Sequence, residues 1–354
     1  MELKNIDLAA NLYAYLQKNG PAGLILLLGD DFYIQSSLAR AVERYYTEHS
    51  GNNIIRLNAD TAQWSDLETS ICNFDIFSPN RLVVLSGADT AKLRELSGHS
   101  RELTDNLGGD KILLVLGPHL KKDTLKTAWF TKLKDVPNYT VQFYPPDISR
   151  LPRWLMQEAA YFGFSLDMRA ACLLAESYEG NIGGAVQTIQ TIGMQGKSRI
   201  ADSDVMPFLS QSTRFVVFEI SDALLAEDSY RSLKILHSLE TQGDFTSLLL
   251  AELNKMLSLI MKLKQSEQTG EQSQTLFRTY GVILQTKQNQ YYNVARRMPV
   301  PHLNNLLRLF ALINSTRMTF DNAQTMRYLE VFTAFFSSPR ELEKFLIGTA
   351  TSNP

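Results

Sequence analysis

The residues of this chain that could bind a phosphate lie in one short loop. Gly29 and Ser36 keep the outer spacing of the phosphate-binding loop G-x-x-x-x-G-K-[ST], which follows an apolar run at 24–28 and leads into a helical pattern. Ile34 stands where that motif has its second glycine, and Gln35 stands where it has lysine. A branched side chain obstructs the approach of the backbone to a phosphate, and glutamine has no charge to meet one. The loop therefore predicts a nucleotide-binding architecture that has lost its nucleotide chemistry.

Three further landmarks of an AAA+ ATPase are also missing from the sequence. Ser86-Gly87 follows an apolar strand pattern where acidic residues would hold Mg²⁺ and polarise the attacking water. Gly117 ends the next strand pattern where a polar side chain would position water, and Gly183 stands near a helix start that usually carries a sensor arginine. Together with the loop, these losses favour an inactive ATPase-like module with no intrinsic catalysis and no cofactor. The alternative is an unrelated α/β domain in which the spacings arise by chance.

Length and composition predict a soluble protein of two or three domains. A chain of 354 residues exceeds one ordinary core, and 44% hydrophobic with 20% charged residues is typical of globular proteins. The polar segment 1–7 does not resemble a signal peptide, and the most apolar helix candidate, 248–263, is interrupted by three charged residues. Cys72 and Cys172 lack metal-ligand spacing, as do the five histidines, so we expect no disulfide, no metal site and a cytoplasmic location.

The apolar pattern divides the chain into an α/β part and an all-α part. Five apolar runs in the first 144 residues alternate with helical patterns, which is typical of a parallel sheet covered on both faces. Pro145-Pro146 ends this pattern, and no convincing strand follows Asp147. The strands are predicted at 24–28, 53–58, 81–86, 111–117 and 139–144, and helices between them at 36–47, 65–72 and 124–133.

Helical patterns fill the remainder of the chain and indicate two further domains. A polar, glycine-containing segment at 193–203 predicts a second hinge, and a Gln/Ser/Glu-rich segment at 265–274 predicts a linker. We therefore expect an α/β domain at 1–144, a small helical domain at 145–210 and a larger helical domain at 211–354. Helices are predicted at 151–160, 167–178, 182–194, 216–225, 229–240, 245–265, 286–298, 301–320 and 322–336.

A second motif, Asn73-Phe74-Asp75-Ile76-Phe77, lies between a predicted helix and the turn Ser78-Pro79-Asn80. It resembles Gln-Leu-[Ser/Asp]-Leu-Phe, the consensus with which bacterial proteins bind the sliding clamp. Phe74, Ile76 and Phe77 would be apolar anchors that enter a preformed groove, and a turn would make them project. The alternative is that Ile76 and Phe77 pack under the sheet as core, with Phe74 partly exposed.

The order of these features resembles the delta subunits of the bacterial DNA polymerase III clamp loader. The degenerate loop, the Phe74–Phe77 element and the two helical parts occur in the same order. Three further stretches carry the resemblance, which covers essentially the whole chain and is strongest over 110–190. They are Ala128-Trp129-Phe130-Thr131, Leu151-Pro152-Arg153-Trp154 and Tyr178-Glu179-Gly180-Asn181.

The resemblance implies an AAA+-like protein that does not hydrolyse ATP, with a lid domain at 145–210 and an oligomerisation collar at 211–354. It implies that the collar joins the ATPase motor subunits and delta-prime in a complex with DNA polymerase, a nucleotidyltransferase. It also implies that Phe74, Ile76 and Phe77 bind the sliding clamp, the beta subunit, and open its ring for loading on primer–template DNA. The usual Leu-Phe tip reads Ile76-Phe77 here. A tyrosine that some members place near the DNA junction has no counterpart at 320–326, so that role is not transferred.

An ATP-binding enzyme with a non-standard phosphate loop is one alternative function. Lys121 or Lys122 would have to replace the missing lysine, although a solvated basic face explains this pair better.

A stand-alone DNA-binding module is another alternative. Arg296-Arg297 and Tyr291-Tyr292 suit phosphate contact and base stacking, and residues 245–354 carry twelve Lys and Arg against seven Asp and Glu. The whole chain, however, has a formal net charge of −2. Tyr291, Ala295 and Met298 also fit one face of an amphipathic helix, and packing in a core is the simpler interpretation.

Overall fold

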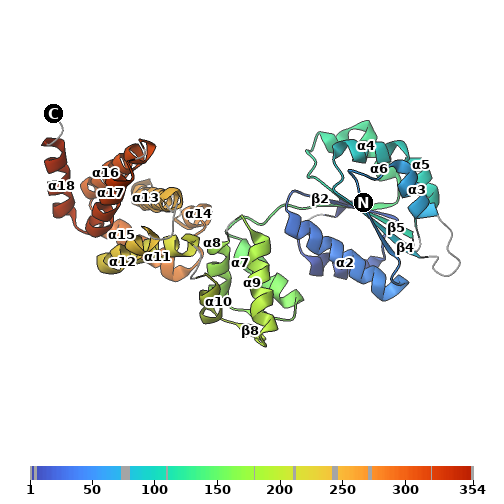
Figure 1. Ribbon diagram of the computed structural model, residues 1–354, viewed down its shortest axis with the longest axis horizontal. Coiled ribbons are helices and arrows are strands. Elements are labelled where there is room, and N and C mark those ends of the chain that lie inside the picture. The colour runs from blue at the N-terminus through green and yellow to red at the C-terminus, as the bar shows by residue number, and fades with distance from the viewer. Residues whose placement is uncertain are drawn as a thin grey trace. The chain divides into compact units, whose positions relative to one another are not determined.

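The computed structural model describes residues 2–3, 6–72, 80–108, 111–178, 180–209, 213–240, 246–269, 273–319 and 321–351. By its internal contacts the chain divides into two units (Figure 1). The first unit contains residues 1–146 and 157–163, and the second contains residues 147–156 and 164–354.

A six-stranded parallel sheet forms the centre of the first unit, in the order β1-β6-β2-β5-β4-β3. All five predicted strands are present. The additional strand, β1, escaped prediction because two residues are too few to show a pattern. The strands are β1 (Glu2–Leu3), β2 (Leu24–Leu28), β3 (Ile54–Asn58), β4 (Arg81–Ser86), β5 (Lys111–Gly117) and β6 (Asn138–Gln142).

Helices cover both faces of this sheet, which explains why its central strand is apolar throughout (Figure 1). Leu24, Leu26 and Leu28 of β2 face a core that includes Leu93 and Phe130. Alternate residues of a strand point to opposite faces, so Ile25 and Leu27 face the side of α2. The helices are α1 (Ala9–Asn19), α2 (Phe32–Ser50), α3 (Trp64–Cys72), α4 (Thr90–Gly98), α5 (Ser100–Asn106), the short 3₁₀ helix η1 (Thr124–Lys126) and α6 (Ala128–Asp135).

The second unit is helical apart from one short parallel pair of strands, β7 and β8. The expectation that no strand follows Asp147 is therefore wrong, because two-residue strands give no periodic signal. The predicted linker at 265–274 is also wrong, since α13 runs to Thr269 and α14 begins at Ser273. The elements are α7 (Leu151–Tyr161), β7 (Ser165–Leu166), α8 (Met168–Ser177), α9 (Ile182–Met194), β8 (Arg199–Ile200), α10 (Asp202–Leu209), α11 (Thr213–Leu225), α12 (Ser229–Glu240), α13 (Thr246–Thr269), α14 (Ser273–Thr279), α15 (Gln285–Arg297), α16 (Val300–Met318), α17 (Asn322–Phe335) and α18 (Pro339–Thr351).

Helix α7 supplies residues to both units, because its first turns group with the second unit and residues 157–163 with the first. The domain boundaries expected after 144 and after 210 stay predictions. Among the described helices, none combines the length and the apolar character that crossing a membrane requires.

Candidate functional site: the degenerate nucleotide edge

The predicted nucleotide-site residues of the first unit gather at the carboxyl ends of its central strands. Gly29 follows β2, Gly117 ends β5, and the backbone N–H of Gly29 donates to the carbonyl of Gly117 at 3.1 Å. Ser86 ends β4, the strand beside β5, and Gly87 follows it. The structure thus brings together the predicted residues that follow β2, β4 and β5, which are Gly29, Ile34, Gln35, Ser36, Ser86, Gly87 and Gly117.

Gln35, at the position of the phosphate-binding lysine, is tied to the backbone of the sheet. Its side-chain Nε2 donates to the carbonyl oxygens of Gly117, at 2.9 Å, and Leu27, at 3.2 Å. A neutral amide can satisfy these carbonyls in a half-buried position without placing a charge there. The residue therefore joins the ends of β2 and β5, and its donor is committed to the protein itself.

The amino end of α2 already has a carboxylate of its own. Asp31 caps the helix, and its Oδ1 accepts a hydrogen bond of 2.9 Å from the backbone N–H of Ile34. This cap explains why α2 begins at Phe32 and not at the predicted Ser36. A helix amino end favours an anion, and here the anion is supplied by the chain. Ile34 is fully buried, so its side chain belongs to the core.

The space beside Gly29 is filled by Phe143, a residue that sequence reasoning missed. A Cβ atom built on Gly29 would lie only 2.3 Å from the Phe143 ring, which is itself buried. Phe143 follows β6 directly, and its backbone N–H donates to Leu28. The sequence does show an aromatic residue at the end of a predicted strand. It does not show that this strand lies next to β2, so the contact between Phe143 and Gly29 could not be predicted.

The positions that would hold Mg²⁺ and position water have structural roles. Ser86 donates from its hydroxyl to the carbonyl of Leu57 at 3.2 Å. Gly87 has φ = 74°, a backbone conformation that favours glycine. Asp89, the first acidic residue after β4, caps α4 by accepting from the N–H of Lys92 at 2.7 Å. No group of three His, Cys, Asp or Glu residues within the described part of the chain is arranged to hold a metal.

The surroundings of Gly117 are also tightly packed. A Cβ there would lie 3.1 Å from the Leu28 side chain and 3.3 Å from the Ala88 carbonyl. Gly183 lies in the second unit on α9, close to the cap formed by Asn181, whose side chain accepts from the Gly184 N–H at 3.0 Å. Around the predicted site, Gly29 is closely packed, Gln35 and Ser86 bond to backbone carbonyls, and Asp31 and Asp89 cap helices.

No protein-family model matches the chain. Two curated relatives do: it is 27% identical over 263 residues to DNA polymerase III subunit delta of Escherichia coli K12, a match that covers 72% of this chain and 74% of the relative. It is 26% identical over 221 residues to the subunit of the same name from Haemophilus influenzae, covering 61% and 63%. The chain resembles the delta subunit of DNA polymerase III.

The fold resembles that of a solved delta protein as well. The Bacillus subtilis DNA clamp loader delta protein superposes with a TM-score of 0.51 at 14% identity, over 93% of this chain and 99% of that one. The predicted fold class, a parallel α/β sheet followed by a mainly helical part, is confirmed together with the resemblance to delta subunits.

The predicted clamp-binding residues of this delta-like chain, Phe74, Ile76 and Phe77, lie outside the described residues. Their flanks are described: α3 ends at Cys72 and β4 begins at Arg81. The assignment of the motif to clamp binding stays a prediction.

The residues proposed for the alternative functions have other environments. Lys121 and Lys122 are exposed, in agreement with a solvated basic face. Tyr291 and Ala295 are each 1% exposed and pack in the core of the second unit, so Tyr291 is not available to stack on a base. The amphipathic-helix interpretation of this segment is confirmed. Arg297 lies 3.5 Å from the carboxylate of Glu227.

Proposed function

We propose that this chain is the non-ATPase delta subunit of a bacterial DNA polymerase III clamp loader. In this role it binds the sliding clamp, opens an interface of the ring and helps to load the ring on primed DNA for processive replication. The similarity to two delta subunits along most of the chain is the observation that carries the proposal.

Side chains of the protein itself fill the predicted nucleotide site, and this supports a role without catalysis. Gln35 is bonded to Gly117, Asp31 caps α2, and Phe143 fills the space beside Gly29. The neighbouring motor subunits would bind and hydrolyse ATP. The resulting change in the arrangement of the subunits would make this chain available to the clamp.

Phe74, Ile76 and Phe77 are the residues we propose for clamp contact. Three apolar anchors within five residues suit insertion into a preformed groove, where a few buried side chains supply most of the binding free energy. Ring opening then requires that the chain bind the open ring more tightly than the closed one, because a ligand shifts an equilibrium only by its differential affinity.

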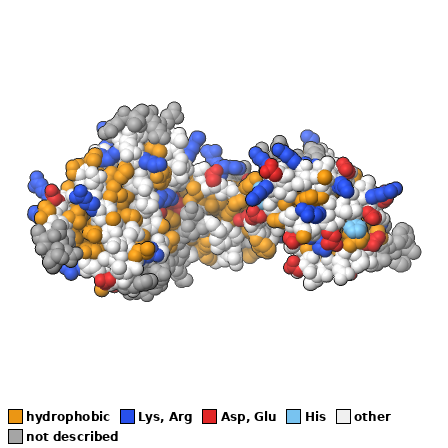
Figure 2. All heavy atoms as spheres, turned by 90° about the horizontal axis from the view of Figure 1, so that it is seen from above, with side chains coloured by type: hydrophobic (Ala, Val, Ile, Leu, Met, Phe, Trp, Pro, Cys, Tyr) orange, Lys and Arg blue, Asp and Glu red, His pale blue; other side chains and the backbone are white. Residues whose placement is uncertain are grey.

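The helices after α10 are the part we propose for contact with the motor subunits and delta-prime. Large apolar side chains are exposed there, including Met318 at 77% and Ile347 at 60%. On the face drawn in Figure 2, apolar and basic side chains gather over the second unit. Apolar exposure of this kind marks a surface that a partner covers, and the positive charges suit primer–template DNA in the assembled complex. A cytoplasmic location follows from this role.

Capture of purified clamp by the immobilised chain tests the proposal. Ile76→Ala with Phe77→Ala is expected to lower clamp affinity at least about tenfold, since loss of two anchors removes more than 1.4 kcal/mol. Phe32→Ala is the matched control, because Phe32 is an aromatic side chain that is 83% exposed elsewhere in the same unit. Gel filtration measures assembly with the motor subunits, which is expected to be unchanged in both variants. Wild-type clamp binding by the double variant contradicts the assignment.

A further inference from the structure

Arg81, the first residue of β4, is a buried arginine with few partners. It is 7% exposed, and its Nη1 donates a hydrogen bond of 2.8 Å to the backbone carbonyl of Ser70. Its Nε has no hydrogen-bond partner, and no carboxylate of the described residues lies within 4.0 Å of its guanidinium group. A buried charge without a counter-ion is costly, so the contact with Ser70 is the place to look for what this arginine does.

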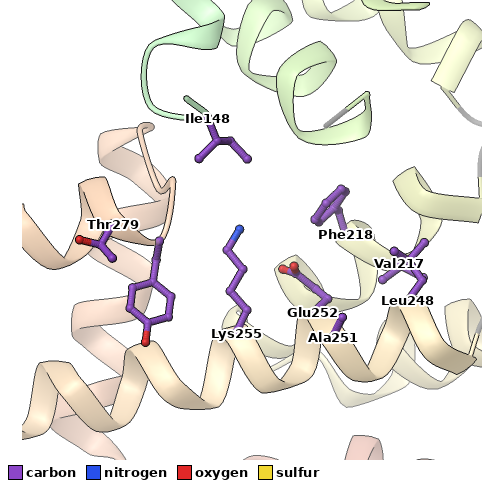
Figure 3. A pocket seen from close by; sticks show the side chains of 9 residues that line it. Ile148, Val217, Phe218, Leu248, Ala251, Glu252, Lys255 and Thr279 are labelled. Atoms are coloured by element: carbon purple, nitrogen blue, oxygen red, sulfur yellow. The ribbon is translucent and has the colours of Figure 1, made fainter. Parts of the chain in front are cut away.

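The other buried charged side chains in the described part of the chain have closer company. Glu158 accepts hydrogen bonds from two hydroxyl groups. Glu252 lines a pocket of about 260 Å³ beside α13, where its side chain lies next to that of Lys255 (Figure 3). That lining offers one acid and one lysine. Arg81 thus differs from both acids in having no group of opposite charge or second hydrogen-bond partner among the described residues.

The contact with Ser70 ties β4 to the last turn of α3. The final carbonyls of a helix have no intrahelical donor, and the last turn of α3 contains no basic residue of its own. Arg81 therefore supplies, from the sheet, the hydrogen-bond donor and the positive charge that a helix carboxyl end favours. Leu67 and Ile71 of the same helix are buried in the core of the first unit, so α3 is held by its apolar side as well.

Asn80 ties the start of β4 to the turn between α2 and β3. Its Nδ2 donates to the backbone carbonyl of Ser50 at 2.9 Å, and its own backbone carbonyl accepts from Asn53 Nδ2 at 3.2 Å. The strand itself is paired on both sides, with β3 and β5. One end of the segment 73–79 is thus fixed to the sheet by Asn80, and Arg81 joins that end to the helix at the other.

We propose that Arg81, assisted by Asn80, is a positioning residue for clamp binding, because it holds the two ends of the segment 73–79 together. This inference rests on the proposed function, which assigns clamp contact to Phe74, Ile76 and Phe77 within that segment. A segment with fixed ends loses less conformational freedom when it enters a groove than one with free ends, so more of the contact free energy appears as affinity. Arg81 has this effect without touching the clamp.

Arg81→Met in the full chain tests the proposal, since it removes both the charge and the donor. Its affinity for purified clamp is expected to fall about tenfold, the change that corresponds to 1.4 kcal/mol. Arg81→Lys keeps a charged donor for the Ser70 carbonyl and is expected to restore most of the affinity. Arg56→Met is the matched control and is expected to bind like the wild type, because Arg56 is an exposed arginine of β3 that pairs with Glu43.

Measurements of stability separate positioning from a merely structural role. Replacing a buried charge with an apolar side chain often leaves stability unchanged, so the urea midpoint of Arg81→Met is expected to stay close to that of the wild type. Val141→Ala makes a cavity in β6, which β2 and β5 separate from β4, and is expected to lower the midpoint but keep wild-type clamp affinity. Asn80→Ala removes the second tie without altering a buried charge. It is expected to weaken clamp binding about threefold, and it tests the proposal even if Arg81→Met fails to fold.

Amide hydrogen exchange tests the tie in the chain alone, without clamp. Exchange at residues 70–72, in the last turn of α3, is expected to be about tenfold faster in Arg81→Met than in the wild type, because the turn opens more often. It is expected to be unchanged in Arg56→Met.

Three results overturn the inference: wild-type clamp affinity in both Arg81→Met and Asn80→Ala, equal loss of affinity in Arg81→Met and Val141→Ala, or unchanged exchange at residues 70–72 in Arg81→Met. Intact clamp binding by the Ile76→Ala, Phe77→Ala double variant would refute the proposed function and this inference together. Intact binding by the Arg81 and Asn80 variants, with binding lost in that double variant, would refute the inference alone, so the two failures are distinguishable.

Discussion

The side-chain Nε2 of Gln35 lies 2.9 Å from the carbonyl oxygen of Gly117, so a hydrogen bond joins the residue at the predicted lysine position to the residue at the predicted sensor position. In an ATPase both positions would face the nucleotide. Here one hydrogen bond joins them to each other. Both residues therefore bond within the sheet, which agrees with the prediction of an inactive nucleotide site.

Restoring the lysine alone is expected not to restore ATP binding. Gln35→Lys supplies the missing charge, but Asp31 still caps α2 and Ile34 still lies in the core. The carboxylate of Asp31 repels the phosphates from the helix amino end that would bind them. Equilibrium dialysis with labelled ATP is expected to show no binding by the wild-type chain or the variant, with a functional phosphate-loop ATPase as positive control. Micromolar binding by either protein contradicts this account and supports the enzyme alternative.

Close packing at Gly29 predicts a specific pattern of stability. Gly29→Ala places a methyl group against the Phe143 ring and is expected to lower the free energy of unfolding by about 1–3 kcal/mol. Gly98→Ala is the matched control, because a Cβ there meets nothing within 4 Å. Phe143→Leu in the Gly29→Ala background is expected to recover part of the loss. Urea unfolding measures all three, and additive effects of the two substitutions would contradict direct contact.

Apolar periodicity predicted most of the fold, whereas the loss of a nucleotide site, inferred from local spacing, stays a prediction. The strand patterns were clear because helices bury both faces of the sheet, and Leu24–Leu28 is apolar at every position. Contacts between distant segments could not be predicted. Phe143 fills the space beside Gly29, and Glu158 of α7 bonds to α2, across 114 and more than 120 residues of chain. The linker prediction at 265–274 failed because glutamine and glutamate are also good helix formers.

Glu158 is expected to make stability depend on pH. Its Oε1 accepts hydrogen bonds of 2.8 Å from the hydroxyls of Tyr33 and Ser37, and the residue is fully buried. Burial raises the pKa of the Glu158 carboxyl, against the opposing effects of these two hydrogen bonds and the Arg40 charge. The folded state therefore holds the proton more strongly than the unfolded state, and this contribution is lost as pH rises through the folded pKa.

Urea unfolding between pH 4.5 and pH 8 measures this effect, over a range that begins near the ordinary glutamate pKa of about 4.3. Across this range the free energy of unfolding of the wild-type chain is expected to fall by about 1.4 kcal/mol for each pH unit by which folding raises the Glu158 pKa. Glu158→Gln keeps an acceptor for Tyr33 and is expected to flatten the dependence. Glu68→Gln, on the exposed surface of α3, is the matched control and is expected to follow the wild type. If the free energy of unfolding of Glu158→Gln depended on pH in the same way as that of the wild type, Glu158 would not be the cause of the pH dependence.

Lys287 is expected to stabilise the second unit as the counter-ion of two partly buried acids. Its ammonium group lies 2.9 Å from Asp222 and 3.5 Å from Glu176, and these charges raise the Lys287 pKa against the effect of burial. Lys287→Met leaves Glu176 without its nearest positive charge and is expected to lower the free energy of unfolding by about 3–5 kcal/mol. Adding Glu176→Gln removes the stranded charge, so the double variant is expected to be more stable than Lys287→Met alone. Lys344→Met, at an exposed ion pair with Glu341, is the control and is expected to cost less than about 1 kcal/mol. A double-mutant cycle by urea unfolding measures the coupling, and a coupling near zero would show that the two charges act independently.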